Sequence, residues 1–236
     1  MLNFTHILFK VNDALFSKNV KCIYCNKELN ENSRNCFCEN CLKRLIYNHK
    51  IKCKQCGNYV YTTTNVCKLC EIDDKHFDYF SSAFAYKGII RSMVKQLKFC
   101  NKRYIGEFLG KFMLEVYLDL NFRCDVAIPI PLYKDAQRKR GFNHANELCK
   151  PFKEFLPVYK NILIKTKNTK EQARLSYQDR QNNLRNCFTV KSPKKIKGKS
   201  ILLIDDVFTT GSTANECSRI LKKFGAGKIF VLTLCC

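Results

Sequence analysis

The sequence lacks any hydrophobic run long enough to cross a membrane. A membrane-spanning helix needs roughly 18 or more consecutive apolar residues, and the 236 residues contain no such run. The sequence also lacks a basic start, a long apolar stretch and a small-residue cleavage site at its beginning, so we expect no secretory signal. We therefore expect a cytoplasmic protein. Its 46% hydrophobic and 26% charged residues are typical of a globular fold.

A nucleotide-binding P-loop is missing as well. Gly198-Lys199-Ser200 matches the end of that motif, but position 193 is Pro where its first glycine is needed. This excludes a P-loop NTPase.

Acidic residues are scarce: 20 Asp and Glu stand against 42 Lys and Arg, a net charge of +22. Residues 1–78 hold 12 basic and 8 acidic residues, and residues 79–236 hold 30 and 12. If eight cysteines in residues 1–78 bind two Zn²⁺ as thiolates, the net charge of this first segment becomes zero. The excess of positive charge in the second segment indicates an anionic partner, such as phosphates or nucleic acid. A general bias of the genome toward Lys is the alternative explanation.

The first 20 residues have the pattern of a short amphipathic helix. Only Lys10 and Lys18 add positive charge to its polar face, so we expect packing against the rest of the protein rather than binding to a membrane surface. The apolar positions of the pattern are Leu2, Phe4, Ile7, Leu8, Val11, Leu15 and Phe16.

Sixteen cysteines are present, and eight of them form four C-x-x-C pairs. The pairs are Cys22/Cys25, Cys38/Cys41, Cys53/Cys56 and Cys67/Cys70. Two such pairs supply the four sulfur ligands of a tetrahedral zinc site. We interpret residues 21–78 as a double zinc ribbon with two structural Zn²⁺, because four thiolates leave no open position for a substrate.

The pairing of the four C-x-x-C pairs is open at this point. If the first C-x-x-C pair shares a zinc with the second, and the third with the fourth, two successive ribbons result. If instead the first shares a zinc with the third, and the second with the fourth, the pairs are interleaved and the ligands are the same. Cys36 is a spare that could replace Cys38, although its spacing to Cys41 is poorer. The segment is too small to bury much core, so the metal must supply folding energy.

Residues 79–236 alternate between strand-like and helix-like patterns, which predicts a parallel sheet covered on both faces. We predict helices over 88–97, 104–120, 143–156 and 212–224, and strands ending near 84–86 and over 125–130, 161–165, 200–204 and 229–234. Ligands bind at the carboxyl ends of the strands in such sheets. The predicted domains are thus 1–20, 21–78 and 79–236.

The segment Ile204–Thr213 follows the strand predicted over 200–204 and carries the chemistry. Asp205 and Asp206 stand at the strand end, a Thr-Thr-Gly turn follows, and a helix then begins. Carboxylates can accept hydrogen bonds from ribose hydroxyls, and the loop together with the start of the helix can bind a phosphate. A plain helix cap, with Thr213 and Glu216 as a capping box, is the structural alternative. It does not explain two adjacent acids, which repel one another without a ligand or cation.

This segment resembles the signature of type I phosphoribosyltransferases, which bind phosphoribosyl pyrophosphate (PRPP). More of the chain, from about residue 20 to 236, is similar to the ComF family, which has a competence branch and a gluconate-associated branch. The matching motifs are the C-x-x-C pairs, Tyr86-Lys87-Gly88, Leu97-Lys98-Phe99, Arg138–Asn143, Gln172-Ala173-x-Leu175 and Arg180-x-x-Asn183-Leu184-Arg185. His144 departs from the family, which more often has Gln there; we interpret it as a replacement for the amide rather than a proton carrier.

The resemblance implies a role for each matching residue. Asp205 and Asp206 would act as the catalytic acids and contact the ribose hydroxyls directly or through Mg²⁺. The 5′-phosphate would be bound by Thr209, Thr210, Gly211, Ser212 and Thr213. Arg138 and Arg140 would bind the diphosphate. Residues 168–185, with Gln172, Arg174, Arg180 and Arg185, resemble a flap over the site, or else form a solvated basic loop.

Two functions follow from the resemblance. The first is a protein of DNA uptake in natural transformation that binds PRPP and single-stranded DNA, with a helicase-like competence partner. The second is an active phosphoribosyltransferase or PRPP sensor without a DNA role. The sequence identifies neither an acceptor for the phosphoribosyl group nor turnover. Residues 134–199 carry 18 basic and 5 acidic residues, more than one PRPP requires, which favours an additional polyanion.

Overall fold

The computed structural model describes residues 21–29, 36–47, 75–120, 123–168 and 184–236. The chain divides into two compact units, Met1–Leu45 and Ile46–Cys236. The predicted helix over residues 1–20 lies outside the described residues, as do Cys53, Cys56, Cys67 and Cys70. In the first unit, the described residues form one short helix, α1 (Glu39–Lys43), and the loops around it.

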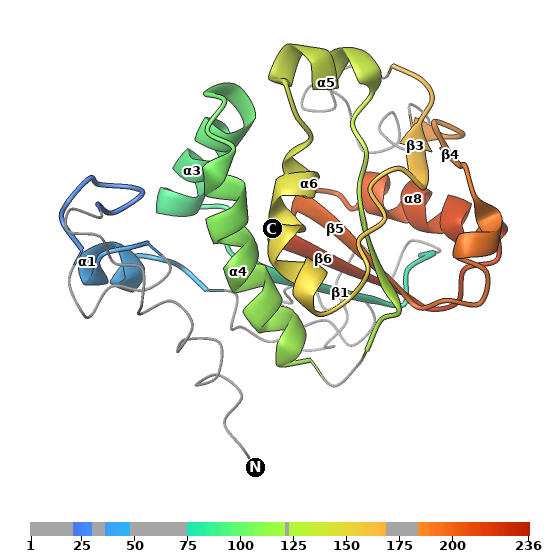
Figure 1. Ribbon diagram of the computed structural model, residues 1–236, viewed down its shortest axis with the longest axis horizontal. Helices are drawn as coiled ribbons and strands as arrows, with labels where there is room; N and C mark the ends of the chain where they lie inside the picture. The colour runs from blue at the N-terminus through green and yellow to red at the C-terminus, as the bar shows by residue number, and fades with distance from the viewer. Residues whose placement is uncertain (1–20, 30–35, 48–74, 121–122, 169–183) are drawn as a thin grey trace. The chain divides into compact units, whose positions relative to one another are not determined.

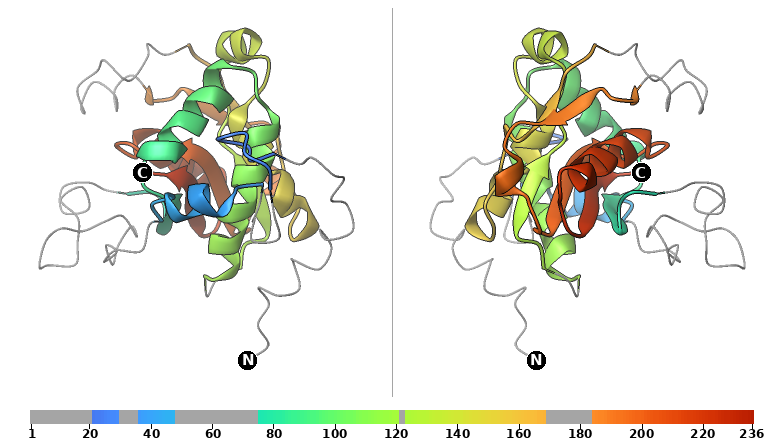
Figure 2. Two further views of the ribbon diagram at one scale, coloured as in Figure 1. Left: turned by 90° about the vertical axis from the view of Figure 1, so that its left-hand side faces the viewer. Right: turned by 90° about the vertical axis from the view of Figure 1, so that its right-hand side faces the viewer.

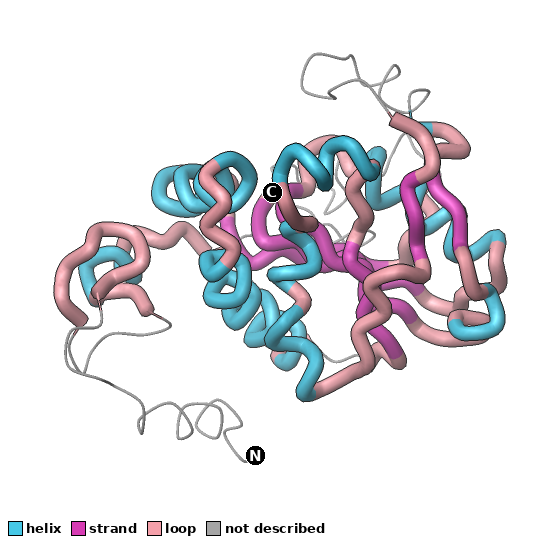
Figure 3. Tube along the Cα trace, turned by 45° about the horizontal axis from the view of Figure 1, so that its top comes forward, coloured by secondary structure: helices cyan, strands magenta, loops and turns pink. Residues whose placement is uncertain are grey.

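The second unit is built on a four-stranded parallel sheet with the strand order β1-β6-β5-β2 (Figure 1). The strands are β1 (Tyr79–Phe84), β2 (Val126–Pro129), β5 (Ile201–Val207) and β6 (Ile229–Cys235). The two central strands, β5 and β6, are almost wholly apolar up to Ile204 and Leu232, as strands buried on both faces must be. The predicted parallel sheet is confirmed. Figure 3 shows the strands of the second unit in magenta, with the helices in cyan around them.

Helices cover both faces of this sheet. Helices α4 (Tyr104–Leu118) and α6 (His144–Leu148) pack on one face, and α8 (Ser212–Lys223) packs on the other (Figure 2). The α4–α6 contact is close because α4 carries glycines: a Cβ atom at Gly106 would lie 2.5 Å from the Cβ atom of Glu147. Helices α3 (Gly88–Phe99) and α5 (Lys134–Arg140) precede α4 and α6 respectively.

Two predicted elements differ in the structure. The helix predicted over 143–156 ends as α6 at Leu148 and continues as a 3₁₀ helix, η3 (Lys150–Glu154). Pro151, which has no N–H to donate, stands at the start of η3 and explains the break. The strand predicted over 161–165 is β3 (Leu163–Lys165), and it lies outside the parallel sheet. It pairs antiparallel with β4 (Phe188–Val190), a strand that was not predicted from the sequence.

The remaining described helix is a 3₁₀ turn, η5 (Pro193–Lys195), which precedes β5. Strand β5 continues past its predicted end at 204 and includes Asp205, Asp206 and Val207. The acid pair is therefore held in the ladder rather than in a loop, because Asp205 and Val207 are register partners of Thr233 and Cys235 in β6. None of the described helices is long and apolar enough to cross a membrane.

Candidate functional site: an acid pair, a hydroxyl-rich loop and a cysteine cluster

Strand β5 sends its two adjacent acids to opposite faces of the sheet. Side chains alternate along a strand, and Ile201 and Leu203 belong to the core cluster that also includes residues of α8. Asp205 follows the same alternation and lines a pocket with the loop that begins α8. Asp206 faces the other side and is 5% exposed. The two acids therefore meet different surroundings.

Asp206 is held by side chains from two helices. The Lys98 Nζ atom, at the end of α3, lies 2.8 Å from Asp206 Oδ2. The His144 Nδ1 atom, at the start of α6, lies 3.4 Å from the same oxygen. The cation that two adjacent acids require is therefore present in the protein itself.

The two acids titrate differently because of these neighbours. Burial, reinforced by the charge of Asp206, raises the pKa of Asp205 to about 7. Burial also acts to raise the pKa of Asp206, but attraction to Lys98 outweighs it and the pKa lies below its usual value. For Lys98, burial lowers the pKa, and attraction to Asp206 outweighs this and raises it. Asp206 and Lys98 are thus a charged pair at neutral pH.

The loop between β5 and α8 presents open donors at the pocket. Within the described part of the chain, no protein acceptor takes the amide hydrogens of Thr209, Thr210 or Gly211. The hydroxyl oxygens of Thr210 and Ser212 lie 2.9 Å apart. The pocket is lined by Asp205, Val207, Phe208, Thr209, Thr210, Gly211, Ser212, Thr213, Ala214 and Thr233. Free amides, hydroxyls and the positive end of a helix dipole together suit a phosphate.

The fold itself requires a glycine at position 211, whether or not a ligand is bound. Gly211 has a φ of 77°, a conformation that favours glycine. A Cβ atom there would lie 2.5 Å from the Phe208 ring, and Phe208 in turn packs against Phe80 with ring centroids 4.0 Å apart.

The capping box suggested for helix α8 is absent: Gly211 is the N-cap, and Glu216 accepts the amide hydrogen of Asn186 at 2.8 Å.

The segment after β2 places cations near the acid pair. Helix α5 ends at Arg140 and is capped by Gly141, whose φ is 77°. Asn143 then caps α6 by accepting the Ala145 amide hydrogen at 3.1 Å, and its side-chain amide donates to the Ile130 carbonyl at 2.9 Å. This bracing sets Arg140 beside His144, with Arg140 Nη1 3.3 Å from His144 Nε2.

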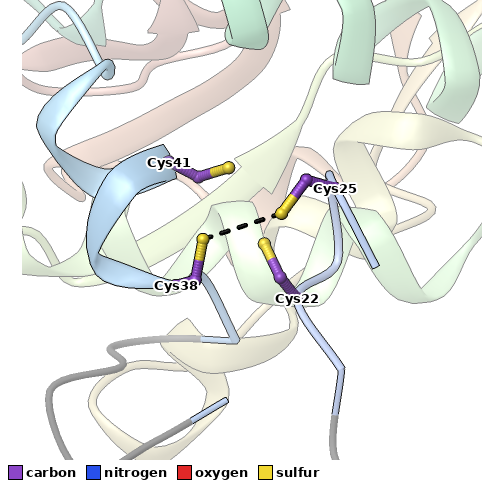
Figure 4. Close-up of side chains that lie close together, drawn as sticks. All are labelled: Cys22, Cys25, Cys38 and Cys41. Carbon is purple, nitrogen blue, oxygen red and sulfur yellow. Dashed lines mark hydrogen bonds between the residues drawn. The ribbon is translucent and has the colours of Figure 1, made fainter. Parts of the chain in front are cut away.

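The first unit brings four cysteine sulfurs together. The Sγ atoms of Cys22, Cys25, Cys38 and Cys41 all lie within 4.8 Å of one another, and those of Cys25 and Cys38 are 3.6 Å apart (Figure 4). A tetrahedral zinc with Zn–S bonds of about 2.3 Å requires sulfurs about 3.8 Å apart, so this donor set fits Zn²⁺. Burial raises the pKa of Cys22, but the backbone amides of Cys25, Cys38 and Tyr24 outweigh it and lower the pKa to about 7.

The cluster decides two questions that the sequence left open. Consecutive C-x-x-C pairs share the first site, not interleaved ones, and the group contains Cys38 rather than Cys36. The local fold explains the arrangement: the Cys22 amide donates to the Lys27 carbonyl at 2.7 Å, and the Asn26 amide donates to the Cys22 carbonyl at 2.9 Å. Asn26, the residue after the second ligand, has φ 61° and ends the tight turn that carries Cys22 and Cys25.

Comparison with known proteins assigns the family. Residues 138–235 match the phosphoribosyl transferase domain family. The chain is 30% identical over 221 residues to Competence protein F of Haemophilus influenzae, which covers 90% of this chain and 95% of that protein. The chain belongs to the ComF family. It is also 28% identical to DNA utilization protein YhgH of Escherichia coli K12 over 206 residues, 84% of this chain and 89% of YhgH. Competence protein ComFC of Bacillus subtilis is 28% identical over 193 residues, 77% of this chain and 76% of that protein.

The structure places most of the site residues predicted for a ComF protein at one edge of the sheet. Asp205 and the loop Thr209–Thr213 line one pocket, and Arg140 contacts His144 next to Asp206. Arg138 does not line that pocket. Its side chain is 81% exposed and lines a shallow hollow with Lys134, Gln137 and Gly141. The flap residues Gln172, Arg174 and Arg180 lie outside the described residues.

From the sequence, Lys98 was identified only as part of a family motif, and no role in the site was predicted for His144. The alternation of β5 side chains was the signal that could have separated the two acids. The helical spacing was the signal for the cation, because Lys98 falls one turn after Val94 and two turns after Ile90, on the apolar face of an amphipathic helix.

His144 predicts a pH dependence of stability. Burial, together with Lys98 and Arg140, lowers its pKa from 6.5 to about 4, and attraction to Asp206 opposes this only in part. Between pH 6.5 and 4 the unfolded chain binds a proton that the folded chain does not, so the free energy of unfolding falls as the pH falls, by about 3 kcal/mol at most. We expect His144→Gln to flatten that fall, because a glutamine keeps one donor and one acceptor without titrating. Denaturant unfolding at pH 7 and pH 4.5 measures the effect; an equal fall in both proteins would contradict it.

Proposed function

We propose that this ComF protein acts in DNA uptake and that its second unit binds PRPP at the β5–α8 loop. The names of its relatives, competence proteins and a DNA utilization protein, support the first part. The observation that carries the second part is the loop itself. The open amides of Thr209, Thr210 and Gly211 border the same pocket as the Asp205 carboxyl group.

The loop suits the 5′-phosphate, and Asp205 suits the ribose hydroxyls. Amide hydrogens at a helix start bind phosphate oxygens, and a carboxylate accepts hydrogen bonds from two neighbouring hydroxyls. Arg140 is the cation placed for the diphosphate, and Arg138 reaches the site only if its exposed side chain turns inward. Mg²⁺ would be held by the diphosphate and Asp205, and it would neutralise negative charge on the leaving group.

The test is a calorimetric titration of the full chain with PRPP in the presence of Mg²⁺. We expect saturable binding, and weaker binding of ribose 5-phosphate, which lacks the diphosphate. The absence of binding heat with PRPP would overturn the proposal and leave the loop as an inherited scaffold.

We propose single-stranded DNA as a second ligand, bound at the opposite edge of the sheet. Lys199 precedes β5 and Lys228 precedes β6, so both lie at the amino ends of parallel strands, away from the pocket at the carboxyl ends. The ring of Tyr159 lies below Lys195 and Lys199, with Nζ atoms 6.0 and 5.6 Å from its centroid. Lysines grouped around an aromatic ring suit phosphates and a stacked base.

We expect DNA binding to weaken steeply as salt is added, because bound phosphates release counterions. Charge reversal at Lys194, Lys195, Lys197 and Lys199 is expected to reduce the salt slope by about 3, at about 0.7 for each phosphate that is no longer neutralised. PRPP binding should be unchanged. The matched control reverses four exposed lysines elsewhere: Lys87, Lys95, Lys102 and Lys153. Fluorescence anisotropy with a labelled oligonucleotide measures the slope, and an unchanged slope removes this group from the DNA site.

A further inference from the structure

Lys98 has no part in the function proposed so far, yet it contacts one of the two acids directly. Its ammonium group lies 2.8 Å from Asp206 Oδ2, and the two side chains are only 22% and 8% exposed. Because the pair is so shielded from water, removing either partner would leave the other as an uncompensated buried charge, which is costly. Ile90 and Val94, two turns and one turn before Lys98, and the adjacent Leu97 are all buried, so this lysine lies at the buried face of α3.

The pair lies on the side of β5 that faces away from the loop pocket. Asp205 lines that pocket, and Asp206 is not among the residues that line it. Asp206 instead faces Lys98 and His144. A ligand at the loop therefore meets Asp205 first, and it would reach Asp206 only if Lys98 moved.

The tautomer of His144 follows from its neighbours. Arginine can only donate hydrogen bonds, so the contact of 3.3 Å between Arg140 Nη1 and His144 Nε2 makes Nε2 the acceptor. The ring proton is then on Nδ1, which faces Asp206 Oδ2 at 3.4 Å. Asp206 is thus paired with Lys98, and the neutral ring of His144 lies beside the same oxygen with its Nδ1 proton toward it.

We propose that Lys98 is a positioning residue that acts as the counter-ion of Asp206. It fixes that carboxylate on the α3 side of β5 and leaves Asp205 as the acid that meets the sugar. This inference rests on the proposed binding of PRPP at the loop. Its physical reason is charge: a bare carboxylate beside the pocket would repel an incoming polyanion, and Lys98 cancels that repulsion.

The test compares the affinities of four variants for Mg²⁺-PRPP at a temperature where each is folded. Lys98→Met leaves Asp206 uncompensated, and we expect binding about tenfold weaker than wild type. Asp206→Asn combined with Lys98→Met removes both charges, and we expect recovery to within about threefold of wild type. Lys98→Arg should bind nearly as wild type, because a guanidinium also pairs with a carboxylate. Lys95→Met, an exposed lysine on the same helix, is the control and should have no effect.

The alternative, in which Asp206 contacts the sugar, predicts changes in PRPP affinity of the opposite direction. If Asp206 itself contacts the sugar, Lys98→Met frees it and binds at least as tightly as wild type, while the double variant binds far more weakly than Lys98→Met. Either result would overturn the inference. Should Lys98→Met alone fail to fold, the double variant decides, because it contains no unpaired charge. A wild-type protein that gives no heat with PRPP refutes the proposed function instead, and that outcome is distinct from both.

Discussion

The Asp205→Asn variant is expected to bind Mg²⁺-PRPP at least about 100-fold more weakly than wild type, because it loses two hydrogen bonds to a charged acceptor, each worth about 1.5–3 kcal/mol. Asparagine keeps the shape of the side chain but offers one acceptor oxygen and no charge. The double variant Asp205→Asn, Asp206→Asn is expected to give no detectable heat. Asp205 carries this effect because it is the acid that lines the loop pocket.

The control for this prediction is Asp119→Asn. Asp119 ends α4 and is exposed, so its replacement removes one negative charge without touching the pocket. Calorimetry gives the affinities, and thermal unfolding shows whether each variant remains folded. An Asp205→Asn variant that binds as tightly as Asp119→Asn would show that the pocket does not hold the sugar.

The acid pair alone is weaker support for a ligand than the sequence indicates. In the sequence, adjacent acids point to a ligand or a metal because like charges repel. In the structure Lys98 compensates Asp206 at 2.8 Å, and the raised pKa of Asp205 lowers its average charge. The proposal therefore depends on the loop, whose amide hydrogens at Thr209, Thr210 and Gly211 find no protein acceptor among the described residues.

The sheet and the loop could be predicted because their signals are local. Continuous apolar runs mark β5 and β6 as buried strands, and a Thr-Thr-Gly turn before an amphipathic pattern marks the start of α8. The resemblance to the ComF family also rested on short local motifs, and the comparisons confirm it.

The contacts of Asp206 could not be predicted because they join segments far apart in the chain. Lys98 comes from α3 and His144 from α6, and only the tertiary fold brings both side chains to Asp206 on β5. The two-stranded β3–β4 sheet was missed for a related reason. Its strands have three residues each and depend on one another and on the core, and neither segment has a strong pattern by itself.

Loss of the first zinc is expected to unfold the first unit while leaving the PRPP affinity of the second unit unchanged. The described residues of the first unit bury only two apolar side chains besides cysteines, Phe37 and Leu45. So small a core cannot offset the entropy of ordering the chain. Structural zinc contributes apparent binding free energies of about 10–16 kcal/mol at pH 7, which is more than this core can replace.

The test counts zinc in the purified chain after release by a thiol-modifying reagent. Eight ligands predict about two zinc ions per chain, and Cys38→Ser should leave one. Cys36→Ser is the matched control: Cys36 is a close neighbour in sequence that lies outside the four-sulfur group, so its variant should keep both. Zinc should also leave as the pH falls, because protons compete for the thiolates. One zinc or none in wild type would refute the double ribbon. A Cys36→Ser variant that loses zinc while Cys38→Ser keeps it would show that the first site uses Cys36 in place of Cys38.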